Sequence, residues 1–180
     1  MRALVALSSL VLAGLVLFAR PADADPNRVF AGKIMMSEKR FPTYAKSPSA
    51  YTAAIKKQSK TSFQENKEKQ EWKIHFIGFL RQPLNDVEYV VKIYELGGRG
   101  QQLLSTFEQF TDSRGQKTLT SSVVLQKKQF GVNKQLLITM ENRGKVLAAG
   151  KVKILGQGER YTGKVDFSEE EAQKGASDEE

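Results

Sequence analysis

The sequence predicts an all-β protein, an antiparallel β-sandwich of about seven or eight strands with one short helix near the N-terminus. Three observations lead to this prediction. From Trp72 onward, apolar and polar residues alternate with a period of two. Turn residues, chiefly Gly, Asn and Asp, interrupt the alternation at short intervals. The 180 residues include no Cys, so an apolar core has to hold the layers together without disulfides.

The first 24 residues have the three parts of a secretory signal peptide. Arg2 supplies the positive charge, residues 3–18 are apolar apart from two serines and a glycine, and a small-x-small cleavage motif ends at Ala24. The apolar run is shorter than the roughly 20 residues that span a bilayer. We therefore expect export, cleavage before Asp25 and a mature chain without a transmembrane segment.

Export and the absence of Cys together indicate a compartment. Small secreted eukaryotic domains often depend on disulfides, whereas this chain has none and has enough residues for an ordinary core. We therefore predict a location in the periplasm or at the exterior of a Gram-negative-type bacterium.

Residues 25–70 are expected to carry a strand, a helix and a linker that pack on the sandwich. The apolar segment 29–36 predicts the strand, and the polar segment 64–70 predicts the linker. Ser47 followed by proline is a helix-start signal, and lysines suit the far end of a helix, which predicts a helix over 49–60. The sequence leaves open whether this helix caps the sandwich or stands outside it.

Residues 71–167 are expected to form the body of the sandwich. Trp72 is expected to fill the space between its two layers. The strand number and turn spacing resemble those of immunoglobulin-type sandwiches, which implies no activity. The predicted strands are 72–81, 87–94, 103–110, 118–125, 136–140, 146–155 and 161–167.

The last residues, 168–180, are expected to form an acidic tail. Ser168 and the three glutamates after it satisfy a capping box, which predicts a short helix over 168–174. Residues 166–180 have a net charge of −6, whereas residues 25–165 carry 25 basic and 12 acidic side chains. The tail either folds back on this basic body or remains free, and for residues 175–180 the sequence favours a free, disordered tail.

The sequence lacks the combinations of residues that most catalytic mechanisms need. His75 is the one imidazole and lies in mid-strand, without a nucleophile or an acid that the sequence places beside it. The scattered carboxylates form no recognisable pair, so a hydrolase is a remote alternative. The glycines around Arg99 indicate a hairpin turn and not a phosphate loop. We expect no catalysis, no cofactor and no metal ion.

The charge pattern leaves two functions open. The first is a non-catalytic binding or structural protein of the cell envelope that contacts a protein partner through a strand edge or a basic face. The alternative is a binder of acidic glycan, lipopolysaccharide or membrane headgroups. Nucleic acid is not expected as a partner after export. The candidate residues of the basic face are Lys127, Lys128, Lys134, Arg143, Lys145, Lys151 and Lys153.

Overall fold

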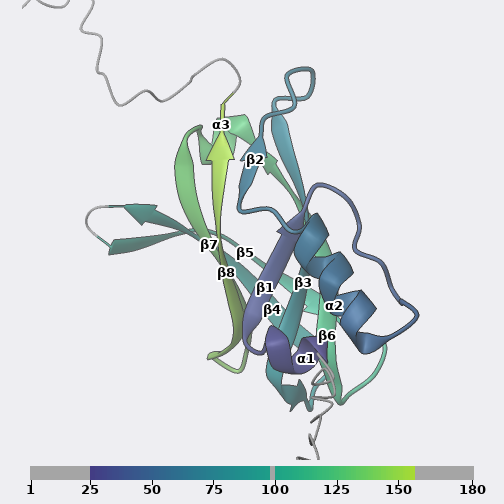
Figure 1. The fold of residues 1–180 in the computed structure, drawn as a ribbon. Coiled ribbons are helices and arrows are strands. Elements are labelled where there is room, and N and C mark those ends of the chain that lie inside the picture. Colours follow the sequence, from purple (N-terminus) through teal and green to yellow (C-terminus); the bar gives the residue numbers. More distant parts are fainter. Residues whose placement is uncertain (1–24, 98–99, 157–180) are drawn as a thin grey trace, which may run out of the picture.

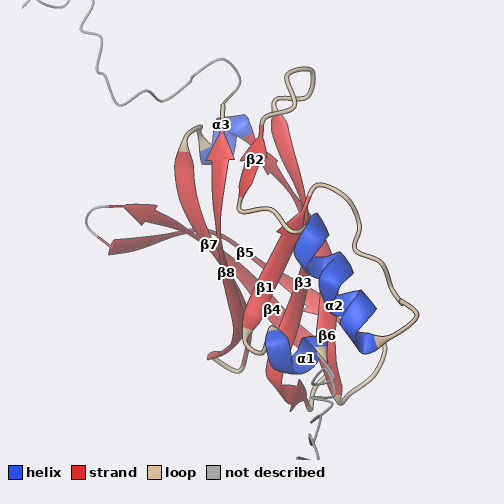
Figure 2. Cartoon of the chain, viewed as in Figure 1, coloured by secondary structure: helices blue, strands red, loops and turns tan. Residues whose placement is uncertain are grey.

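The computed structural model describes residues 25–97 and 100–156 of the chain. Within these ranges the protein is all-β, as predicted, with eight strands and three helices (Figure 1, Figure 2). The elements are α1 (Pro26–Val29), β1 (Lys33–Ser37), α2 (Pro48–Gln58), β2 (Ser62–Gln64), β3 (Glu71–Leu84), β4 (Glu88–Gly97), β5 (Gly100–Phe110), β6 (Gln116–Gln126), α3 (Lys127–Phe130), β7 (Lys134–Asn142) and β8 (Lys145–Leu155).

Several predictions fall on residues outside the described ranges. They are the signal peptide at 1–24, the strand at 161–167, and the terminal helix and acidic tail at 168–180. No helix in the described ranges is long and apolar enough to cross a membrane.

All eight strands belong to one mixed sheet. Its order is β5-β4-β7-β8-β1-β3-β6, and β2 pairs with β8 beyond the point where β1 does. The pairings of β8 with β1 and β2 are parallel, and the other pairings are antiparallel. Figure 2 shows this sheet curling on itself. The predicted two-layer antiparallel sandwich of immunoglobulin type is therefore not confirmed, because one curled sheet takes its place.

The alternation could not distinguish these two architectures. A period of two identifies which side chains are buried, but a second sheet and a curled part of the same sheet bury them equally well. The curl depends on β1, which pairs with β3 along one edge and approaches β8 along the other. Gly150 permits this approach, since a Cβ at that position would lie only 2.6 Å from the carbonyl oxygen of Ile34.

The larger core cluster lies on the inner face of the curled sheet. It draws buried side chains from β1, β2, β3, β4, β6, β7, β8 and α3. On β3 its members include Trp72, Ile74, Phe76 and Leu80, which are alternate residues of the predicted strand 72–81. The indole Nε1 of Trp72 donates to the carbonyl oxygen of Leu155 at 3.1 Å. Trp72 therefore closes one end of this interior, next to the end of β8, and does not separate two sheets.

The outer face of β3 is covered by the helices α1 and α2 (Figure 1). Ile77 and Phe79 of β3 pack there with Phe30 after α1 and Ile55 of α2. The predicted start signal of α2 is confirmed, because the Ser47 hydroxyl accepts the amide N–H of Ala50 at 3.1 Å. The helix thus caps the sheet, which the sequence had left open.

Two local predictions need correction. The expected strand at 29–36 starts only at Lys33, because Asp25 and Pro26 begin α1 with the same cap-then-proline signal as α2. The segment before the polar linker also contains the short strand β2, whose Phe63 is fully buried and pairs with Ile154 of β8. A three-residue strand is too short for its alternation to be recognised.

Candidate functional site

The two outermost strands of the sheet, β5 and β6, each pair on one side only among the described residues. Each strand has 11 residues and a single charged side chain, Glu108 in β5 and Lys117 in β6. Proteins commonly protect such edges with several charges, prolines or bulges. Both edges therefore present backbone groups to which another strand can bind.

The edge of β6 is the more regular of the two. In β5 the register with β4 shifts between Ser105 and Leu103, which places a bulge at Leu104. In β6 the register with β3 is unbroken from Thr118 to Gln126. An unbroken edge presents its free backbone groups at a constant spacing, so β6 is the better template for an added strand.

The hydrogen bonds to β3 show which backbone groups of β6 point outward. The amide N–H of Lys127 donates to the carbonyl oxygen of Gln70 at 2.9 Å, and this bond continues the β3–β6 ladder. Along an antiparallel pair, bonded positions alternate with positions whose N–H and C=O face away from the partner. Thr120, Ser122 and Val124 are the outward-facing positions in the middle of β6.

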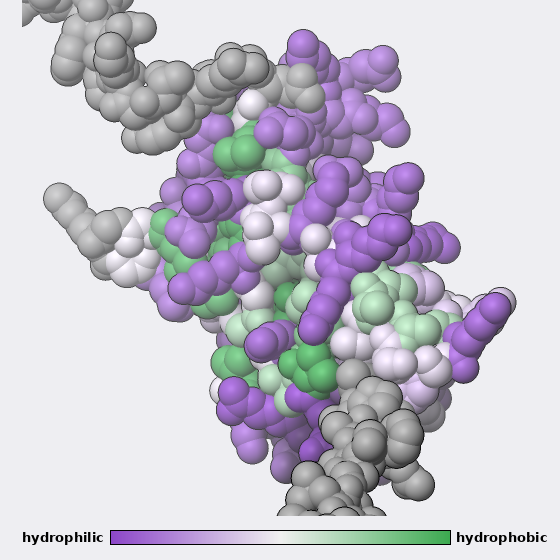
Figure 3. Space-filling model, in the orientation of Figure 1, coloured by the Kyte–Doolittle hydropathy of each residue, from purple (hydrophilic) through white to green (hydrophobic). Residues whose placement is uncertain are grey.

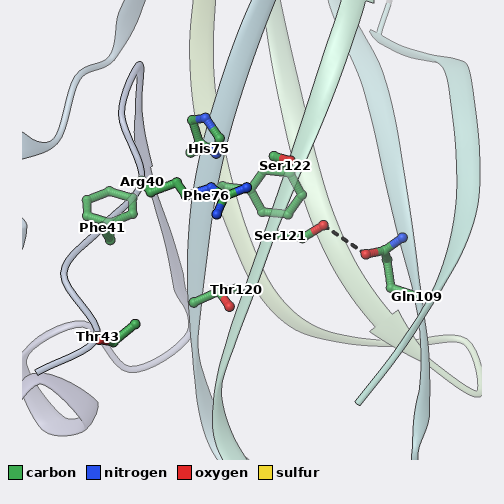
Figure 4. A pocket seen from close by; sticks show the side chains of 9 residues that line it. All are labelled: Arg40, Phe41, Thr43, His75, Phe76, Gln109, Thr120, Ser121 and Ser122. Atoms are coloured by element: carbon green, nitrogen blue, oxygen red, sulfur yellow. Dashed lines mark hydrogen bonds between the residues drawn. The ribbon is translucent and has the colours of Figure 1, made fainter. Parts of the chain in front are cut away.

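A cavity of about 460 Å³ lies along this outward-facing edge (Figure 4). Its lining comes from four parts of the chain: β6, β3, the loop after β1, and β5. The lining residues are Thr120, Ser121, Ser122, His75, Phe76, Arg40, Phe41, Thr43 and Gln109. Most of them are polar, and the hydroxyl-bearing side chains belong to β6 and the loop.

A side-chain hydrogen bond joins the two open edges on one side of the cavity. The Ser121 hydroxyl lies 2.9 Å from Oε1 of Gln109, to which it donates (Figure 4). Tyr89 of β4 is also close to Ser121, and burial raises the pKa of its phenol, so it stays protonated at neutral pH. The Ser121–Gln109 bond joins two side chains and so occupies no backbone group of β6.

The opposite wall of the cavity is a loop that α2 holds in place. The side-chain amide of Gln58, at the end of α2, donates to the carbonyl oxygens of Lys39 at 2.8 Å and of Arg40 at 2.7 Å. It also lies 3.2 Å from the Ser37 hydroxyl. These bonds fix the backbone from which the Arg40 side chain extends toward the strands in Figure 4.

The charge around the cavity is positive. Burial lowers the pKa of His75, and the positive charges of Lys73 and Arg40 lower it further. The lining includes no carboxylate. Arg40 forms no ion pair with any residue of the described ranges. The cavity is therefore an uncompensated positive environment beside a free strand edge.

The seven residues of the predicted basic face do not form one cluster. Lys127 and Lys128 lie in α3, and Arg143 and Lys145 lie at the turn between β7 and β8. Lys145 and Lys153 are at opposite ends of β8, roughly 26 Å apart at about 3.3 Å per residue.

Three of the seven are also neutralised by nearby acids. The ion pairs are Lys127–Glu65 at 3.1 Å, Lys134–Glu95 at 2.7 Å and Arg143–Asp86 at 3.1 Å. The others, Lys128, Lys145, Lys151 and Lys153, have no ion pair within the described ranges.

A second polar cluster lies on the outer face of β4 and β7. Glu141 is 6% exposed, and its carboxylate accepts from Lys92 at 2.7 Å and from Thr139 at 2.8 Å, with the Tyr94 hydroxyl 3.5 Å away. Burial raises the pKa of Glu141, but the bonds from Lys92 and Thr139 outweigh it and hold the pKa below its usual value. Both oxygens of the Glu141 carboxylate therefore have partners, and the cluster connects β4 to β7.

Comparison with known proteins assigns the chain to no family. No protein-family model matches the chain, and no curated protein aligns with it significantly. Among the described residues, no group of three or more His, Cys, Asp or Glu side chains is arranged to hold a metal ion.

Sequence reasoning placed His75 in mid-strand but missed its surroundings. No sequence pattern marks Arg40 and Gln58 as part of a site, because their roles depend on the contact between α2 and the loop after β1. The outward-facing positions of β6 were also inaccessible, since a strand's pattern does not reveal whether it lies at an edge of its sheet.

Proposed function

We propose that this protein is a non-catalytic binding protein that accepts an extended segment of another protein at the edge of β6. The observation that carries the proposal is the row of outward-facing backbone groups at Thr120, Ser122 and Val124. The first two of these residues line the cavity. Strand addition of this kind obtains affinity from main-chain hydrogen bonds and specificity from the neighbouring side chains. The remaining walls of the cavity would supply that specificity.

Exposed apolar side chains support the same proposal. The described residues include six large apolar side chains that are exposed, and three of them, Leu103, Phe110 and Val124, belong to β5 or β6. Apolar groups beside free backbone groups favour pairing with another strand. The proposed setting is the bacterial envelope, because residues 1–24 have the pattern of an export signal.

A non-catalytic role fits the surroundings of His75. Hydrolases of the serine type need an acid to orient the histidine and a nucleophile beside it. His75 instead has two cations near it, and no carboxylate lines its cavity. We therefore propose binding and not hydrolysis as the use of this cavity.

Site-specific crosslinking in cells tests the proposal. A photo-reactive amino acid is placed at Val124, which is 43% exposed on β6, and in a control variant at Val146, which is 52% exposed on β8. We expect discrete crosslinks to a partner protein from position 124 and far fewer from position 146. Equal crosslinking from both positions would count against β6 as the binding edge.

Two proline variants provide a sharper comparison. Ser122→Pro removes an N–H of β6 that points away from β3. Thr106→Pro is the matched control on β5. The bond from the Thr111 N–H to the carbonyl oxygen of Val87 shows which residues of β5 bond to β4, and the N–H of Thr106 points away from β4. We expect both variants to fold and only Ser122→Pro to lose its crosslinked partner. Retention of the partner by a folded Ser122→Pro variant would exclude strand addition at β6.

A second candidate function is the binding of an acidic polymer. Lys151 and Lys153 alternate along β8, both are exposed, and neither is paired with an acid of the described ranges. Binding of this kind weakens steeply as salt rises. Retention of the protein on heparin should decrease as salt rises, and it should decrease in the double variant Lys151→Glu, Lys153→Glu if this face binds the polymer. Unchanged retention in the double variant would exclude this face.

A further inference from the structure

We infer that the segment accepted at the edge of β6 carries a carboxylate that Arg40 binds. The inference rests on the proposed strand addition and specifies the chemistry of the partner. Its basis is the position of Arg40, beside the row of backbone groups that an added strand would use. A strand hydrogen-bonded to Thr120 and Ser122 would pass directly along the cavity that Arg40 lines.

The charge balance of the cavity argues for an anion. Arg40 lines it, with Lys73 close enough to act on His75, and the lining residues include no acid. Arg40 also lacks a carboxylate partner within the described ranges. A guanidinium binds a carboxylate through two parallel hydrogen bonds, a geometry that selects an acid over an amide.

The backbone that carries the exposed Arg40 side chain is held in place by α2. Its carbonyl oxygen accepts from the Gln58 amide at 2.7 Å, and that of Lys39 accepts from the same group at 2.8 Å. An arginine on a held backbone loses less freedom on binding than one on a free loop. Gln58 is thus a positioning residue for this contact.

Acid conditions would strengthen such binding through His75. The groups that face its imidazole are Lys73 from its own strand, Arg40 from the loop, and the uncharged Ser37 and Ser122 opposite it on β1 and β6. Burial, and after it the positive charges of Lys73 and Arg40, lowers the pKa of His75 in the free protein, whereas a bound carboxylate would raise it. Binding would then take up a proton, so affinity rises as the pH falls.

Peptide selection on the full exported chain tests the inference. Random peptides displayed on phage are selected on the wild-type protein and, in parallel, on Arg40→Gln and Ser122→Pro. We expect wild-type selection to enrich extended peptides that contain Asp or Glu. Arg40→Gln should retain peptides without that preference, and Ser122→Pro should retain none of either kind.

Affinity measurements with one selected peptide complete the test. The peptide is capped at both ends, so that its only carboxylate is the side chain, and is compared with a copy in which an amide replaces the acid. We expect about a tenfold weaker binding of the amide copy to the wild type and equal binding of both to Arg40→Gln. Tighter binding of the acidic peptide at pH 6 than at pH 8 should disappear in His75→Gln.

The outcomes separate this inference from the function on which it rests. Peptides that need an intact Ser122 but show no acid preference would overturn the role of Arg40 and leave strand addition in place. Peptides that bind Ser122→Pro as well as the wild type would overturn both. Binding that appears only after removal of residues 166–180 would identify the chain's own acidic end as the occupant, and a dimer abolished by Ser122→Pro would identify a second copy.

Discussion

The side-chain amide of Gln58 donates to the carbonyl oxygen of Arg40 at 2.7 Å, across 18 residues of sequence. This contact connects the end of α2 to the loop that forms one wall of the cavity. It makes the position of a charged side chain depend on a helix that otherwise contributes apolar packing to the outer face of the sheet.

We predict that Gln58→Leu loosens the loop without unfolding the protein. The substitution removes bonds that are partly exposed to solvent, each worth about 0.5–1.5 kcal/mol, so the free energy of unfolding should fall only modestly. Amide hydrogen exchange should quicken over residues 38–43. Ala53→Leu, on the same helix but exposed, is the control and should leave that exchange unchanged. Unchanged exchange in Gln58→Leu would show that the loop is held by other contacts.

Removing either member of the Lys92–Glu141 pair should destabilise the protein to different extents. Lys92→Met leaves a carboxylate that is only 6% exposed without its cation, which costs about 3 kcal/mol. Glu141→Gln leaves a lysine whose side chain is 31% exposed and can turn to water, so this variant should lose less stability. Urea unfolding of the two variants measures the difference, and equal losses would contradict the assigned burial.

The same pair should produce a recognisable pH dependence. The folded-state pKa of Glu141 lies below its usual value, chiefly because the bonds from Lys92 and Thr139 outweigh the effect of burial. Its contribution to stability is therefore complete above that value and is lost as the pH falls through the folded-state pKa. Glu141→Gln should flatten the acid side of the stability profile, whereas Thr139→Val should only lessen the slope. A Glu141→Gln variant with the wild-type slope would assign that slope to another group.

Gly150→Ala should test the closure of the sheet. A Cβ at this position would lie 2.6 Å from the backbone carbonyl oxygen of Ile34, so the backbones of β1 and β8 would have to separate. We expect a loss of about 1–3 kcal/mol in the free energy of unfolding. Gly144→Ala is unsuitable as a control because of its positive φ, whereas Ala149→Ser adds one atom on the same strand. A stable Gly150→Ala variant would contradict the close approach of β1.

Local rules predicted most elements of this fold but not their assembly. Alternation placed Trp72, Ile74 and Phe76 on one buried face, and the Ser47–Pro48 pair placed the start of α2. Both signals act within a few residues of sequence. The single curled sheet depends on the parallel contact of β1 with β8, which joins residues far apart in the chain and leaves no periodic trace.

The candidate site was harder to predict for the same reason. Its members Arg40, His75, Gln109 and Ser122 come from four separate segments. The density of basic residues in the second half of the chain drew attention to Lys127 and Lys134, but these side chains are paired with Glu65 and Glu95. Composition reports charge, whereas only the fold shows which charges remain uncompensated.

Amide exchange measured by NMR, first on the free protein and then with a selected partner peptide, tests the open edge of β6 most directly. In the free protein, the amides of Thr120, Ser122 and Val124 should exchange rapidly, and those of Ser121 and Val123 between them should be protected by bonds to β3. The peptide should then slow the first three at least tenfold and leave Thr106 of β5 unchanged. Protection of all five amides in the free protein, or no slowing at the alternating positions when peptide binds, would contradict the account.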